Sequence, residues 1–211
     1  MISVRHAGRL AALVALSLAA ACSVLPERNP VDIYRLPSAL TPAPASASGR
    51  GTLRVSMPHA TYRLESPRIA VIAEANRIST YAGARWADTP PAMMRDRLTE
   101  ALRSGGGYVN VTTAESNVQA ELDLDTELRA FHSEYRQGQP HAVIALQAQL
   151  VATATRRIVA SRAFEVAEPA DGTAVPVVVD AFGRAADALA REVADWAARQ
   201  ERPAGAAVTL R

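Results

Sequence analysis

The C-terminal half of the chain carries the pattern that most limits how the chain can fold. Three long segments, 121–135, 141–155 and 157–166, have the alternation and residue types of β-strands, and we interpret them as antiparallel strands. The next segment, 178–196, repeats apolar residues at steps of three and four, which predicts one long amphipathic helix ending near residue 199. A sheet and a helix of these lengths must bury their apolar faces against each other.

The region before these strands predicts further strands and a second helix. Pro90-Pro91 suits a helix start, and Gly105-Gly106-Gly107 ends the apolar pattern that follows it. The strands are predicted at 53–57, 68–74, 77–82 and 108–112. Together these segments predict an α/β fold, with a mixed, largely antiparallel sheet and helices packed on its faces.

The first 21 residues have the features of an export signal. Arg5, His6 and Arg9 form a charged start, and residues 10–21 are apolar apart from one serine. A helix of that length spans about 18 Å, too short for a hydrocarbon core of about 30 Å, so we predict a signal peptide and not a transmembrane helix. All 23 basic residues are arginine, and without the two in the leader the rest equal the 21 acidic residues in number. We therefore expect a neutral mature chain that binds no nucleic acid.

Cys22 is the only cysteine and directly follows three alanines. The arrangement resembles a bacterial lipobox, in which the cysteine becomes the acylated N-terminus, although Ala19 stands where leucine is usual. Cleavage by ordinary signal peptidase, which would leave a free thiol, is the alternative. We predict lipidation of Cys22 and anchoring of the mature protein to a membrane. Ser23 in place of an aspartate favours transfer to the outer membrane.

Composition divides the exported chain into three parts. Residues 22–51 hold five prolines among serine, alanine and glycine, which predicts a flexible lipid-anchored linker with one short edge strand at 33–36. Residues 52–201 are predicted to form a single α/β domain. Residues 202–211 are predicted to be a disordered tail.

No motif in the chain predicts catalysis, so we expect a non-enzyme without a metal or another cofactor. The glycines at 105–107 follow a helix, and the positive dipole end that binds phosphate lies at a helix start, so they predict a helix end. Glu121, Asp123, Asp125 and Glu127 alternate along one strand and predict its solvent-facing side. An acidic partner-binding patch and a divalent-cation site are the alternatives for this row. The histidines of the mature chain lack metal-ligand spacing.

Tyr81, Arg85 and Trp86 form a tentative partner-binding site. Tyrosine, arginine and tryptophan dominate the energetics of protein interfaces, and these three stand together before a proline pair. The alternative interpretation places Trp86 in the core beneath the first helix. Trp196 lies on the apolar stripe of the last helix and is expected in the core.

Several short motifs follow one another in a characteristic order. They are the cysteine at 22, IYRLP at 33–37, RIAV at 68–71, YAGARWA at 81–87, PP at 90–91, LTEAL at 98–102, LQAQL at 146–150 and ASRAF at 160–164. This series resembles the ABC-type transport auxiliary lipoprotein family over roughly residues 22–200. The family usually has a second tyrosine at the position of Ala82.

The resemblance implies an outer-membrane lipoprotein that faces the periplasm. It would act beside an MCE-domain protein that spans the periplasm, in a system that moves phospholipid between the two membranes. A ring-shaped partner favours a cyclic homo-oligomer of this chain. The implied fold is related to the N-terminal domain of TolB-like proteins, a three-layer α/β/α arrangement. The order of strands and helices is equally compatible with a two-layer α+β sandwich.

These observations lead to two main hypotheses about function. The first is an acylated adaptor that docks the periplasmic end of an MCE assembly to the outer membrane. The second is a pilotin or assembly lipoprotein for another outer-membrane complex. A periplasmic hydrolase, the remaining class, would need a deep polar pocket converging on His132 or His141.

Overall fold

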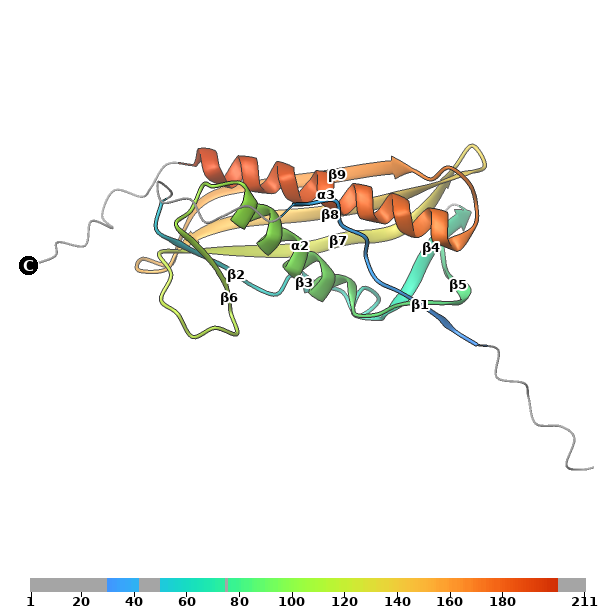
Figure 1. Cartoon of the computed structure of the whole chain (residues 1–211), viewed down its shortest axis with the longest axis horizontal. Coiled ribbons are helices and arrows are strands. Elements are labelled where there is room, and N and C mark those ends of the chain that lie inside the picture. Colours follow the sequence, from blue (N-terminus) through green and yellow to red (C-terminus); the bar gives the residue numbers. More distant parts are fainter. Residues whose placement is uncertain (1–29, 42–49, 75, 201–211) are drawn as a thin grey trace, which may run out of the picture. The chain divides into compact units, whose positions relative to one another are not determined.

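The computed structural model describes residues 30–41, 50–74 and 76–200 (Figure 1). The predicted signal peptide, Cys22 and the predicted tail at 202–211 lie outside these ranges. The elements are β1 (Asp32–Tyr34), β2 (Thr52–Val55), β3 (His59–Ala60), β4 (Arg68–Glu74), β5 (Arg77–Trp86), α2 (Pro90–Ser104), β6 (Asn110–Thr113), β7 (Leu122–Arg136), β8 (Gln139–Ala152), β9 (Arg157–Pro169) and α3 (Val175–Arg199). Within these ranges, no helix has both the length and the apolarity needed to cross a membrane.

Strands β7, β8 and β9 form a long antiparallel meander, as predicted. Leu124 pairs with Leu150 and Leu128 with Leu146, and all four side chains are buried on the same face of the sheet. The alternate residues of β7 are mostly polar and remain partly or fully exposed. Alternation of apolar and polar residues therefore gives this sheet one buried face, which we call the dry face, and one solvent-facing face, which we call the wet face.

The shorter strands share the other edge of β7. Strands β2, β3 and β4 pair with it one after another, each in parallel, while β8 occupies its opposite edge. Strand β6 extends the sheet beyond β2, and β5 and then β1 extend it beyond β4. The sheet is thus mixed, because its long hairpins are antiparallel and several shorter pairings are parallel.

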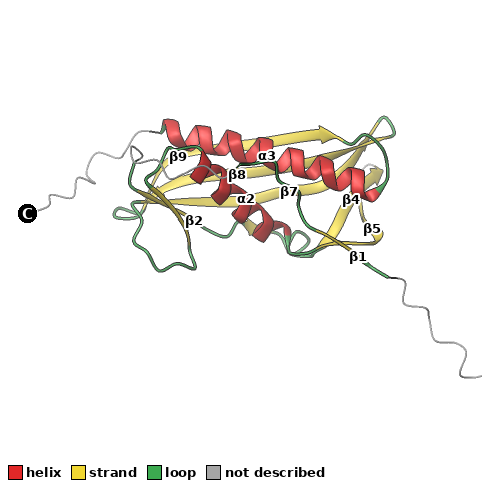
Figure 2. Cartoon of the chain, in the orientation of Figure 1, coloured by secondary structure: helices red, strands yellow, loops and turns green. Residues whose placement is uncertain are grey.

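Both described helices cover the dry face of the sheet (Figure 2). Helix α3 packs on β8 and β9, α2 packs on β2 and β6, and the two helices contact each other. The predicted α/β class, with a mixed sheet and helices packed against it, is confirmed. The described residues form two layers, however, and not the three-layer version, since the opposite sheet face is polar and carries no helix among them. Gly105, with its N–H donating to the carbonyl of Ala101, ends α2 as predicted.

The folded unit begins earlier than composition predicted. Strand β1 lies at the sheet edge, parallel to the end of β5, and the chain from Val31 onward clusters with the rest of the domain. The domain start predicted at residue 52 is therefore wrong by about twenty residues. Proline-rich composition misled the prediction, because much of what fixes this segment is contact of its backbone, and the side chains that it packs on the core, Tyr34, Leu36 and Leu40, form no regular pattern.

Candidate functional site

The segment from Val31 to Thr41, which we call the strap, joins the predicted anchor to the body of the protein. Its first part, β1, pairs with β5 and adds a strand to the sheet. The N–H of Ala87 donates to the carbonyl of Tyr34 at 2.7 Å and continues this pairing. Its second part runs across the two helices, where side chains of α2 and α3 hold its backbone. The strap therefore contacts three separate elements of the fold.

A buried ion pair between the helices holds the middle of the strap. Arg97 of α2 and Asp187 of α3 are 5% and 2% exposed and hydrogen bond to each other. Arg97 Nη2 donates to the carbonyl of Pro37 at 2.6 Å, and Asp187 Oδ2 accepts from the N–H of Ala39 at 2.8 Å. Two buried charges are tolerated only when paired and further hydrogen bonded, and the strap backbone supplies those extra bonds.

A glycine lets the strap approach α3 closely. At Gly183, an added Cβ would lie 2.9 Å from the carbonyl oxygen of Pro37 and 3.0 Å from its Cβ. Glycine in the middle of a helix costs roughly 0.5–1 kcal/mol relative to alanine, so this position trades helix stability for contact with the strap. Ser104 of α2 donates to the carbonyl of Thr41 at 3.1 Å and fixes the end of the strap.

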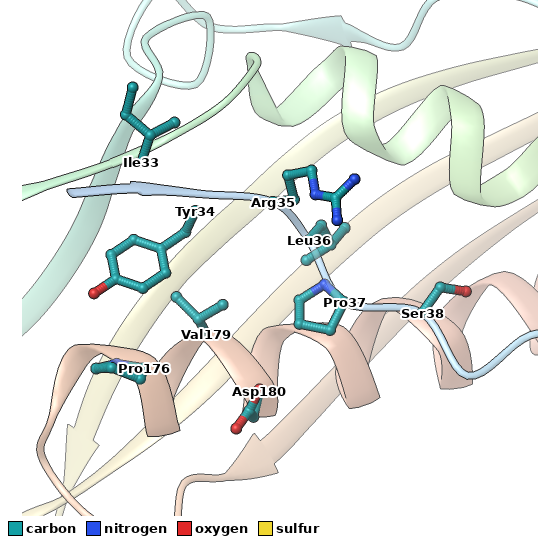
Figure 3. A pocket seen from close by; sticks show the side chains of 9 residues that line it. All are labelled: Ile33, Tyr34, Arg35, Leu36, Pro37, Ser38, Pro176, Val179 and Asp180. Carbon is teal, nitrogen blue, oxygen red and sulfur yellow. The ribbon is translucent and has the colours of Figure 1, made fainter.

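The strap and the first turns of α3 enclose an open cleft of about 610 Å³ (Figure 3). Tyr34 projects toward Val179, and Ile33 projects to the opposite side of β1. The lining residues are Ile33, Tyr34, Arg35, Leu36, Pro37, Ser38, Pro176, Val179 and Asp180. Neither His132 nor His141, the histidines that a hydrolase site would need, lines this cleft.

Trp86 lies in the centre of the core. It is 1% exposed, and its ring meets Phe131 at 5.7 Å and Phe182 at 5.2 Å in edge-to-face geometry. Its indole N–H has no hydrogen-bond partner among the described residues. This placement agrees with the core interpretation of Trp86, because a side chain so buried presents almost no surface to a partner.

Tyr81 and Arg85, the other two residues of the tentative site, differ in exposure. Tyr81 is half-buried, and its hydroxyl donates to Ser133 Oγ at 3.1 Å. Burial raises the pKa of Tyr81 to about 12, so it remains a neutral hydrogen-bond donor at physiological pH. Arg85 is exposed on the opposite sheet face from Trp86. The structure therefore does not gather the three side chains into one surface.

The row of four carboxylates is divided among separate neighbours. Glu121 accepts from the N–H of Thr52 at 2.6 Å, and Asp123 lies 3.5 Å from Arg54 Nη1. The other two, Asp125 and Glu127, lie beside His59 and Arg129. Among the described residues, no cluster of three or more histidine, cysteine or acidic side chains could hold a metal ion.

Burial lowers the pKa of His132, which lies on the wet face of β7. His141, on β8, has its Nδ1 3.1 Å from the carbonyl oxygen of Gln139. Strand register sets His132 opposite Val143 and His141 opposite Glu134, so the two imidazoles do not share a cross-strand pair.

Sequence reasoning missed the ion pair that holds the strap. Both residues stand within apolar stripes: Arg97 shares its helix face with buried Met94 and Ala101, and Asp187 shares its face with buried Ala190. A charge on the buried face of each of two helices, with opposite signs, was the available signal. The periodic pattern of apolar residues does not reveal this signal, because a charged residue in an apolar stripe only weakens the pattern.

The fold and the strap together define a class of protein, a two-layer α/β module whose N-terminal segment is clamped onto its helices. Residues 34–194 match the model of the ABC-type transport auxiliary lipoprotein component family. The chain belongs to this family. It is accordingly a lipoprotein-family member and an auxiliary component of transport, and the predicted family is confirmed.

Several solved structures are similar to this chain. The crystal structure of protein XCC0632 from Xanthomonas campestris is 31% identical, covers 79% of this chain and 94% of its own, and superposes with a TM-score of 0.72. An uncharacterized protein, 15% identical, covers 80% of this chain and 99% of its own with a TM-score of 0.64, and shares the fold. Lipoprotein GNA1162 from Neisseria meningitidis is 13% identical, covers 69% and 99%, and has a TM-score of 0.39. Comparison with curated proteins gives no match.

Proposed function

We propose that this protein is a lipid-anchored adaptor of the outer membrane. Acylated Cys22 would hold the α/β module on the periplasmic side, beside an MCE-domain protein that spans the periplasm and carries phospholipid between the membranes. The family supports the transport role, and the leader followed by Cys22 supports the anchor. The observation that carries the proposal is the strap, a clamped connection between the anchor and the module.

The strap gives the adaptor a short reach. Eight residues separate Cys22 from Val31, and the nine backbone steps between the two span about 30 Å when fully extended. If the strap were free, the segment that tethers the module to Cys22 would extend to Arg50 and reach about 95 Å. Clamping therefore holds the module close to its membrane, which suits a protein that positions one end of a larger assembly.

The anchor is tested by Cys22→Ser in the native envelope. The variant should lose acylation and remain unprocessed or periplasmic, while the natural chain fractionates with the outer membrane. Fractionation of the natural chain with the inner membrane would reject the outer-membrane location. An acylated variant in the outer membrane would reject the role of Cys22 itself.

The partner is tested by capture of the acylated protein from its native envelope, with identification by mass spectrometry. Recovery of an MCE-domain protein supports the adaptor role, and recovery of a secretion or pilus assembly complex instead supports the pilotin alternative. Two differently tagged copies in one cell report the expected homo-oligomer. Arg85→Ala, at the exposed member of the tentative site, should reduce recovery of the partner if this residue contacts it.

A further inference from the structure

Three exposed residues form a row across the edge of the sheet that β1, β5 and β4 make. Arg68 of β4 pairs directly with Arg85 of β5, and Arg85 pairs in turn with Ile33 of β1. Directly paired residues share one face of a sheet, and all three side chains here are exposed. The row lies on the wet face, because the neighbours Ile69 and Trp86 are buried on the other face.

The two arginines of this row are an unfavourable pair within the protein alone. Like charges directly opposite each other on neighbouring strands destabilise a sheet. Neither Arg68 nor Arg85 forms an ion pair with a carboxylate among the described residues. Arg35, at the end of β1, is exposed and likewise has no acidic partner within the described ranges. Positive charge is thus concentrated here although the mature chain is neutral overall.

Exposed aliphatic side chains adjoin this charge. Val31 and Ile33 are 53% and 57% exposed, and their spacing of two residues puts them on the same side of the strap. Figure 3 shows that Ile33 and Tyr34 project to opposite sides of β1. We call these five residues, Val31, Ile33, Arg35, Arg68 and Arg85, the tether patch. Arginine beside aliphatic side chains matches the chemistry of an anionic bilayer surface, which offers phosphate groups and shallow apolar chains.

We propose that the tether patch docks on the surface of the membrane that holds the anchor, through anionic phospholipid headgroups. The inference rests on the proposed function for the anchor at Cys22. Only eight residues lie between Cys22 and Val31, so the patch remains within about 30 Å of the lipid surface. At that distance a weak attraction acts at high effective concentration. The acyl chains give attachment, and the patch sets which side of the module faces the lipid.

The test uses an environment-sensitive fluorophore on the acylated full-length protein. With Cys22 acylated, Ile33→Cys supplies a single free thiol for the label. The labelled protein is reconstituted in vesicles of phosphatidylcholine alone, or of phosphatidylcholine with phosphatidylglycerol. Emission at position 33 should increase about twofold and shift to the blue only with phosphatidylglycerol, and the increase should vanish in high salt.

Matched controls separate the patch from general adsorption. Ile158→Cys carries the same label at an isoleucine that is also 57% exposed, but that belongs to the other end of the long strands, opposite Val151. Its emission should not depend on the lipid. Arg68→Gln with Arg85→Gln should remove at least about half of the response at position 33, since each arginine contributes separately. Arg157→Gln, at an exposed arginine of β9, should leave the response intact.

Three other outcomes overturn the proposal. Equal emission in both vesicle types would show that the patch does not recognise anionic lipid. An equal response at position 158 would show adsorption without orientation. A response that requires an added envelope protein would assign the patch to a protein partner. Flotation of the vesicles reports the anchor separately, so loss of flotation in both lipid mixtures identifies failure of the proposed function and not of the patch.

Discussion

The meander of β7, β8 and β9 and the N-terminal strap are held to the same helices by different kinds of interaction. The meander buries rows of leucine, isoleucine and alanine under α3, and its hydrogen bonds run between strands that are neighbours in the sequence. The strap packs Tyr34, Leu36 and Leu40 against the core only partly buried, and its backbone bonds to one ion pair from distant parts of the chain. The first region therefore supplies stability, and the second fixes the position of one segment.

The largest effect is expected in the aromatic core beside the meander. Trp86→Ala should lower the free energy of unfolding by about 3–5 kcal/mol, because it leaves a cavity between Phe131 and Phe182. Chemical denaturation measures this loss. Trp86→Phe should cost much less, since the lost indole N–H has no described partner. A loss of less than about 1 kcal/mol in Trp86→Ala would contradict the core placement.

A somewhat smaller loss is expected when the clamp is broken. Asp187→Ala should cost about 3 kcal/mol, because Arg97 remains buried without its partner charge. Hydrogen exchange should also show loss of protection at the N–H of Ala39, which donates to Asp187. Denaturation and exchange together measure both effects.

Replacing the whole pair separates its two roles. Arg97→Met with Asp187→Leu should recover most of the unfolding free energy, because apolar side chains of similar size can replace a buried ion pair. Protection at Ala39 should not recover, since no acceptor replaces the carboxylate. Recovery of both would show that the strap is held by packing, as the meander is.

Gly183→Ala should affect the strap while leaving the stability of the meander and its helices almost unchanged. Alanine favours the helix by up to about 1 kcal/mol, but its Cβ would crowd the carbonyl of Pro37. We expect little change in the free energy of unfolding and faster proteolysis or exchange of the strap. Unchanged exchange of the strap would mean that it can shift without loss of its contacts.

The last expected effect, at Tyr81, is a small one that depends on pH. Tyr81→Phe removes the hydrogen bond to Ser133 and should cost about 1 kcal/mol near neutral pH. The pKa of Tyr81 is raised to about 12 from an ordinary value of 10, so its neutral form stabilises the folded state below pH 10. That contribution is lost as pH rises toward 12. The substitution should therefore weaken the alkaline decline in stability, measured by denaturation at pH 10–11.5. An unchanged decline would assign the effect elsewhere, for example to Tyr108, whose pKa is also raised by burial.

The same contrast explains which features could be predicted from the sequence. The regular spacing of apolar residues predicts the long strands and α3, since Leu124, Leu128 and Phe182 occupy regular apolar positions. The parallel pairing of β2, β3 and β4 along β7 has no such signature, because it joins segments that are far apart in the chain. The helix positions were predictable, but two layers could not be chosen over three.

The candidate site was less accessible to prediction than the fold. Tyr81, Arg85 and Trp86 were grouped by residue type, yet alternation along β5 sends Arg85 and Trp86 to opposite faces. The strap is held through the backbone carbonyl of Pro37 and the backbone N–H of Ala39. Nearly every residue of any chain has such backbone groups. These two backbone groups differ from others only in their hydrogen-bond partners in the folded chain, and the sequence does not reveal those partners. Composition therefore predicted a linker for this segment.

The clamp also orders events during synthesis. Ala39 and its acceptor, Asp187, are 148 positions apart in the sequence, and Asp187 lies in α3, the last of the described elements. The strap is made first but cannot be fixed until α3 has been made and has met α2. A molecule truncated before α3 would keep the predicted export leader and Cys22, but its strap would lack the carboxylate that fixes Ala39. Fixing the strap therefore reports that synthesis has reached the end of the domain.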